Sequence, residues 1–109
     1  MLSEHDIEKA VEFLRDSAQE AAQARADRLH LEDFSRVLKS QIMAEHLSEP
    51  LGAQERTAYA DVRYANHLEA LKHAIYLDER FRFLREAASA KIEVWRSQLS
   101  WQKVQDSIR

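Results

Sequence analysis

Apolar residues recur along residues 4–46 at alternating spacings of four and three, which is the rhythm of an amphipathic helix. One series is Ile7, Val11, Leu14, Ala18 and Ala21, and a later one is Leu31, Phe34, Leu38 and Ile42. Between them the rhythm slips through a run of alanines, as it does at a stutter in a coiled coil. Ser3 is suited to cap the start, because its hydroxyl can accept from the free N–H groups of the first turn. The pattern predicts one helix over about residues 4–46.

A second apolar series predicts another long helix over about residues 53–103. Its members are Val62, Ala65, Leu68, Leu71 and Ile75, then Phe81, Leu84, Ala88, Ile92, Trp95 and Leu99. The turn between the two helices is expected at residues 47–52, because Pro50 removes a helical N–H group and Gly52 tolerates unusual backbone angles. Such a short corner makes the helices antiparallel neighbours. We therefore expect an all-α single domain over residues 1–109, folded as a long antiparallel two-helix hairpin.

The apolar series of the second helix is interrupted near Asp78, and this interruption leaves an alternative fold open. If the helix broke at about residue 78, the remainder could fold back onto the hairpin. The chain would then be a three-helix bundle.

A large apolar surface remains outside the predicted contact between the helices. Two helices side by side can cover only one stripe of each other. The apolar residues left over are Leu29, Val37, Met43, Leu47, Tyr59, Tyr64, Tyr76, Leu77, Phe83 and Trp101. Because an apolar surface of this kind on a small protein marks an interface, we expect a homo-oligomer. The residues expected at the oligomer or partner interface are Phe81, Leu84, Ala88, Ile92, Trp95 and Leu99.

Composition agrees with an all-helical chain and excludes several classes of protein. The sequence has one Gly, one Pro and no Cys. A sheet-containing domain would need more turn residues, and a disulfide scaffold or Cys-based zinc site would need cysteines. No apolar run approaches a membrane span, and the N-terminus lacks the basic and apolar regions of a signal peptide. The expected location is the cytoplasm of a bacterium or of a phage-infected host cell.

No pattern of residues predicts catalysis or metal binding. There is no glycine-rich phosphate loop, and the histidines form no His-x-x-x-His pair. The five histidines are His5, His30, His46, His67 and His73. We therefore expect no enzyme activity, no cofactor and no metal.

Charge is distributed unequally between the two halves of the chain. Residues 1–55 carry six Lys and Arg against twelve Asp and Glu, whereas residues 56–109 carry ten against seven. On the second helix, Arg82, Arg85, Arg96 and Lys103 fall in one arc beside the apolar series. Stripes of this kind, aligned in an oligomer, could hold the phosphate backbone of single-stranded DNA, with Phe83 and Trp101 available to stack on bases. The alternative is structural, because arginines beside an apolar stripe can pair with the acids of the first helix.

A short motif in the C-terminal half suggests a family. The stretch Arg56-Thr57-Ala58-Tyr59-Ala60, and above all Ile92-Glu93-Val94-Trp95-Arg96-Ser97, resembles small helical phage proteins encoded among recombination and replication genes. The layout of long helices is similar to that of UvsY-type recombination mediators.

This resemblance implies a homo-oligomer that binds single-stranded DNA and helps a recombinase to displace single-strand-binding protein. Arg82, Arg85, Arg96 and Lys103 would contact phosphates, and Trp95 with Ile92 would hold subunits together. The acidic overall charge departs from the expectation for a DNA-binding protein. The alternative function is a protein-binding helical hairpin, such as a phage assembly protein, chaperone or regulatory adaptor, without nucleic-acid binding.

Overall fold

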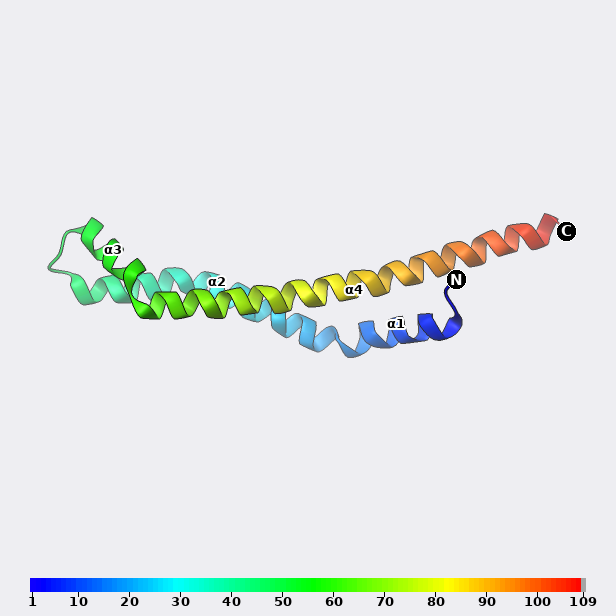
Figure 1. Ribbon diagram of the computed structural model, residues 1–109, viewed down its shortest axis with the longest axis horizontal. Coiled ribbons are helices and arrows are strands. Elements are labelled where there is room, and N and C mark those ends of the chain that lie inside the picture. The colour runs from blue at the N-terminus through cyan, green and yellow to red at the C-terminus, as the bar shows by residue number, and fades with distance from the viewer. Residues whose placement is uncertain (109) are drawn as a thin grey trace. The chain divides into compact units, whose positions relative to one another are not determined.

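The computed structural model describes residues 1–108, and every regular element in them is a helix (Figure 1). The elements in order are α1 (Glu4–Asp16), α2 (Ala18–Met43), the 3-10 helix η1 (Ala44–His46), α3 (Leu51–Ala60) and α4 (Val62–Ile108). The all-α fold class predicted from the sequence is confirmed. No helix within these residues is long and apolar enough to cross a lipid bilayer.

Two single residues interrupt what the apolar rhythm predicts as continuous helices. Ser17 separates α1 from α2, although its N–H still donates to the Phe13 carbonyl at 2.9 Å. Asp61 separates α3 from α4 with an extended backbone, at φ −69° and ψ 139°. Its carboxylate accepts from the Arg63 N–H at 2.7 Å and so caps the start of α4. Periodicity does not reveal the first interruption, because the apolar series from Ile7 to Ala21 continues across Ser17, whereas the second apolar series begins directly after Asp61.

The ends of the second predicted helix also differ from the prediction. Helical structure resumes at Leu51, directly after Pro50, instead of at about residue 53. This position suits proline, whose missing N–H costs nothing at a helix start. At the other end α4 continues to Ile108 instead of ending near residue 103. The break predicted as an alternative near Asp78 is absent, because residues 62–108 form one helix.

The chain divides into two compact units. The middle unit is Ala22–Asp78, and the terminal unit combines Met1–Ala21 with the chain from Glu79 onward. Helices α2 and α4 each contribute one part to either unit.

The middle unit has a closed apolar core. Ile42 and Ala58 are fully buried, and Leu38 is buried beside them. Phe34, Met43 and Tyr64 pack against this cluster. Within the unit, α2 and α4 lie side by side and antiparallel, since Arg28 pairs with Asp78 at 3.2 Å while Ser35 meets His67 (Figure 1). The short helix α3 covers the end of this pair and contributes Ala58 to the core.

The terminal unit is a pair of helices, in which α1 runs antiparallel to the last part of α4 (Figure 1). Its buried apolar residues are Ile7, Ala10 and Ala88. At the start of α1, Asp6 N–H donates to the Ser3 hydroxyl at 3.2 Å and Ser3 N–H donates to the Asp6 carboxylate at 2.9 Å. This reciprocal capping explains the predicted helix start. Hydrogen bonds from Ser3 lower the pKa of Asp6.

Candidate functional site

The basic residues predicted to contact phosphates have different partners within the protein. Arg82 pairs with two acidic residues of its own helix. Its Nε donates to Glu79 at 2.8 Å and its Nη1 to Glu86 at 3.2 Å. Hydrogen bonds that Arg82 donates to Glu79, followed by the charge of that carboxylate, raise the pKa of Arg82. The guanidinium also lies over the Phe83 ring, 4.5 Å from its centroid. Much of the charge of Arg82 is therefore balanced locally.

Arg85 points into the terminal unit and not toward solvent. Its Nη1 donates to the Leu14 carbonyl at 2.7 Å and to the Ser17 hydroxyl at 2.8 Å. The Leu14 carbonyl lies in the last turn of α1, where backbone acceptors lack partners within the helix. Arg85 therefore caps the C-terminus of α1, as cations do at the negative helix end. The sequence left two roles open for Arg85, contact with phosphates or pairing with acids of the first helix. The structure places it against the end of α1, but on a backbone carbonyl and a serine hydroxyl and not on acids.

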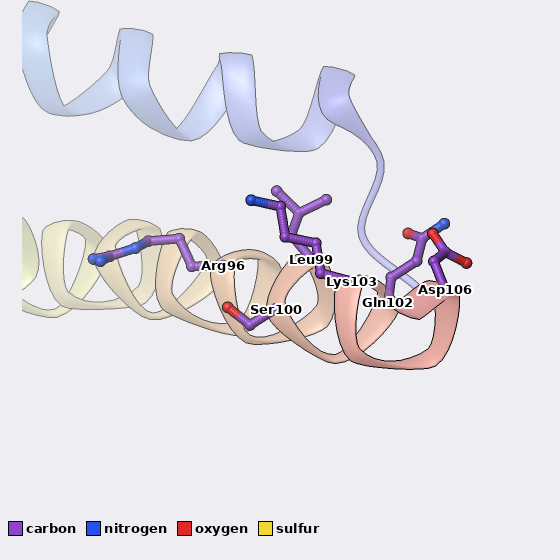
Figure 2. A pocket seen from close by; sticks show the side chains of 6 residues that line it. All are labelled: Arg96, Leu99, Ser100, Gln102, Lys103 and Asp106. Carbon is purple, nitrogen blue, oxygen red and sulfur yellow. The ribbon is translucent and has the colours of Figure 1, made fainter. Parts of the chain in front are cut away.

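Arg96 and Lys103 lie further along α4 and are exposed. Arg96 pairs with Glu93 at 2.9 Å, and both side chains are 69% exposed. Lys103 takes part in none of the ion pairs found among residues 1–108. The two cations help to line a pocket of about 350 Å³, whose other residues are Leu99, Ser100, Gln102 and Asp106 (Figure 2). Figure 2 shows the side chains of Leu99 and Lys103 extending to the same side of the helix.

Most of the residues predicted at the oligomer interface pack inside the terminal unit. Ala88 is buried, and Phe81, Ile92 and Trp95 are half-buried. Trp95 lines a pocket with residues of α1, among them Ile7 and Val11. Leu84 and Leu99 differ, because they are 43% and 41% exposed.

The spacing of the half-buried residues explains why Leu84 is exposed. Phe81, Arg85, Ala88, Ile92 and Trp95 follow each other at four, three, four and three residues. Arg85 therefore occupies the place on the α1-facing side that the apolar pattern gave to Leu84. The apolar pattern alone does not place Arg85 on this side, because arginine is a charged residue. A long arginine side chain can nevertheless lie along an apolar surface, and here its charged end reaches the Leu14 carbonyl of α1.

The middle unit contains a polar pair, of a buried histidine and a half-buried serine, that the sequence did not single out. His67 is 7% exposed, and its Nε2 lies 2.6 Å from the Ser35 hydroxyl. Phe34 and Tyr64 flank the imidazole, with ring centroids 5.7 Å and 6.2 Å from it. The pair joins α2 to α4 and satisfies two polar groups that would be costly to bury alone. The signal available in the sequence was positional, because His67 lies three residues after Tyr64, on the same helix face.

A groove on the middle unit brings two further histidines together from different helices. It has a volume of about 360 Å³ and is lined by Ala24, Asp27, His30, Leu31, Ala70, His73, Ala74 and Leu77. Its lining is mostly apolar, and His30 stacks on Phe34 with ring centroids 6.1 Å apart. Within residues 1–108, no group of three or more His, Asp or Glu side chains has the arrangement to hold a metal ion.

Comparison with known proteins assigns no family, since no protein-family model, curated protein or solved structure matches this chain. The resemblance to phage recombination mediators therefore stays a prediction, and the surfaces described above carry the functional argument.

Proposed function

We propose that this protein is a non-enzymatic, homo-oligomeric helical hairpin that acts in the cytoplasm by binding other proteins through its helix surfaces. The observation that carries the proposal is the exposure of large apolar side chains on the terminal unit. Phe83 is 58% exposed, Trp101 65% and Ile108 74%. Leaving such side chains in water is unfavourable by roughly 25 cal/mol per Å², so a partner that covers them is stabilised.

The polar side chains described above form hydrogen bonds within the fold, and this supports an interaction protein over an enzyme. Arg85 caps α1, and the Ser35–His67 pair lies within the packed helices of the middle unit. Asp61 and Arg63 bind each other at the junction of α3 and α4. Each of these groups stabilises the fold, and catalysis would require such groups to face a substrate site.

A second candidate function is a recombination mediator that binds single-stranded DNA and assists a recombinase. Lys103 and Arg96 favour it, because both are exposed on α4. A second pocket beside them includes Arg96 and Trp101. Cations for the phosphate backbone beside an aromatic ring for a base are the two elements of single-strand binding. Lys103 is better placed for this contact than Arg82 or Arg85, which hold carboxylate or carbonyl partners within the terminal unit.

Light scattering coupled to size exclusion, with and without a short single-stranded oligonucleotide, tests both functions. An oligomer whose mass is the same with and without the oligonucleotide, at low and moderate salt, is the result expected for a protein-binding scaffold. Co-elution at low salt that is lost at moderate salt would move the assignment to the mediator. Binding to single strands weakens with salt by a logarithmic slope of about 0.7 per phosphate contacted. A monomer throughout would contradict the proposed oligomer.

A charge-reversal variant tells DNA contact from a general effect of charge. The double substitution Arg96→Glu and Lys103→Glu should abolish any oligonucleotide binding while leaving the oligomer mass unchanged. Arg36→Glu in the middle unit is the matched control, since the Arg36 side chain is 85% exposed and has the same charge. Equal loss of binding in the double variant and the control would remove Arg96 and Lys103 from the DNA assignment.

A further inference from the structure

A second apolar series runs along α4 on the side away from α1. It starts at Phe83 and continues to Ile108 at alternating spacings of four and three residues. Its large members are Phe83, Val94, Trp101, Val104 and Ile108, which are between 48% and 74% exposed. The positions between them hold the small residues Ala87, Ala90 and Ser97, which are also exposed. We call this series the outer seam.

The outer seam is distinct from the face that packs on α1. At 100° per residue its members fall within an arc of about 100°, roughly opposite the arc that holds Ala88 and Ile92. Phe83, Val94 and Trp101 are exposed, whereas Ala88 on the opposite side of the helix is buried, as this geometry requires. The terminal unit therefore covers one side of α4 and leaves a regular apolar stripe on the other.

The spacing of the outer seam is the heptad repeat of a coiled coil, and it is kept over more than three repeats. In heptad terms Val94, Trp101 and Ile108 occupy a positions, as does Ala87, while Phe83 and Val104 occupy d positions. A surface that repeats in this way is complementary to another helix with the same repeat, and an identical helix is the simplest such partner.

Charges beside the outer seam select the orientation. Glu86 precedes an a position and Lys91 follows a d position, so they are five residues apart at the two edges of the seam. In a parallel, in-register pair, each Glu86 meets the Lys91 of the other chain. In an antiparallel pair that overlays the whole seam, Glu86 would instead lie opposite Ser107 and Lys91 opposite Gln98, so this charge pair would be lost. The charge pattern therefore fits the parallel arrangement.

We infer that the outer seam is the surface through which two copies of this protein associate, as a parallel, in-register coiled coil of their α4 helices. This inference rests on the proposed oligomer and names its surface, its register and its orientation. Both copies present the same residues, so the interface is symmetric. The small residues Ala87, Ala90 and Ser97 allow the two backbones to approach closely along the first half of the seam.

Placing a charge at a heptad a position that the dimer would bury tests whether the outer seam is the interface. Val94→Asp should raise the dimer dissociation constant by about 100-fold or more, because an unpaired carboxylate would be buried at the centre of the interface. Sedimentation equilibrium measures it, and circular dichroism should show unchanged helix content since Val94 is 49% exposed in the single chain. Val37→Asp is the matched control, because Val37 is 48% exposed and lies on α2, in the middle unit. If the Val94→Asp variant still forms the oligomer, the outer seam is not its interface. The proposed oligomer would then be kept and would use another surface.

Charge reversal at the edges tests the orientation. In a parallel pair, Glu86→Lys and Lys91→Glu should each weaken the dimer by a few-fold, because each places like charges opposite each other. Mixing the two variants should restore association as a heterodimer with two correct pairs. An antiparallel dimer that overlays the seam places residues 86 and 91 opposite uncharged residues, so neither substitution would weaken it. Unchanged association of both variants would therefore overturn the parallel arrangement.

A single introduced cysteine tests the register, and the absence of natural cysteines makes the result clear. Val104→Cys places two thiols opposite each other near one end of a parallel, in-register pair, within reach of a disulfide. Mild oxidation should convert most of the protein to a covalent dimer on a non-reducing gel. Asp106→Cys is the control, because residue 106 lies outside the seam. Equal cross-linking of both variants, or none in Val104→Cys, would overturn the proposed register.

Discussion

The two units of this chain differ in how completely each covers its own apolar residues. In the middle unit, three helices surround Ile42 and Ala58, which have no exposed surface. In the terminal unit, two helices bury Ile7 to 8% and Ala88 to 7%, but no large side chain completely. Each helix of a pair hides one stripe, whereas a third helix closes the space between two others. The middle unit therefore has a closed core that the terminal unit lacks, although both units leave large apolar side chains exposed, such as Leu47 and Val62 in the middle unit.

Ion pairs show the same difference between the units. In the middle unit some of them join residues distant in the sequence, such as Arg28 with Asp78 at 3.2 Å and Arg63 with Glu45 at 2.8 Å. In the terminal unit the pair of Arg96 with Glu93 connects neighbours on one helix, as do the pairs of Arg82. Pairs within one helix stabilise that helix slightly but hold no two helices together. The contact of Arg85 with the end of α1 is therefore the main polar link of the terminal unit.

The largest effect is expected from the core of the middle unit. Ile42→Ala removes a fully buried side chain between Leu38 and Ala58. It should lower the free energy of unfolding by about 2–5 kcal/mol, because the cavity adds to the lost transfer energy. Urea denaturation followed by circular dichroism measures the change.

Val37→Ala is the control for this substitution, since Val37 is half-exposed on the same helix. It should change the free energy of unfolding by less than about 0.5 kcal/mol. Equal losses in the two variants would mean that the middle unit has no closed core, and the contrast between the units would fail.

A smaller and more local effect is expected at Arg85. Arg85→Met keeps the apolar stem but removes both donors to α1. The free energy of local opening of α1 should fall by about 1–3 kcal/mol, since buried acceptors lose a charged partner. Hydrogen exchange should then be faster in residues 4–16 and unchanged in residues 34–64.

Arg82→Met serves as the matched control, because Arg82 binds carboxylates of α4 and none of α1. It should leave exchange in α1 unchanged. Faster exchange in both units of the Arg85→Met protein would show that the two units unfold together, which would weaken the comparison between them.

The helical class and the start of α1 could be predicted from the sequence, because both depend on local signals. Ser3 with Asp6, and the scarcity of glycine and proline, are visible without a structure. Which face of one helix packs against which face of another depends on contacts between residues distant in the sequence, so it could not be predicted from local signals. The apolar pattern of α4 fits two faces, one centred on Ala88 and one on Val94, and only the position of α1 distinguishes them. The place of Arg85 on the packed face likewise depends on α1, and the apolar pattern alone does not show it.

The smallest effect is expected at the junction of α3 and α4 and depends on pH. Hydrogen bonds from the Arg63 side chain, and then from its backbone N–H, lower the pKa of Asp61 from 3.8 to about 2. Because the folded pKa lies below the unfolded one, the carboxylate adds stability above pH 3.8 and this contribution is lost as the pH falls to about 2. The melting temperatures of the wild-type protein and Asp61→Asn should therefore differ at neutral pH and converge near pH 2.

A second variant separates the charge of Asp61 from its function as a cap. Asn can still accept the Arg63 N–H, whereas Asp61→Ala removes the acceptor altogether. Asp61→Ala should therefore melt below Asp61→Asn at every pH, with a difference between these two variants that does not depend on pH. A pH-dependent difference between two side chains that do not titrate would have to come from elsewhere in the middle unit. In that case the junction at Asp61 is not the source of the acid sensitivity.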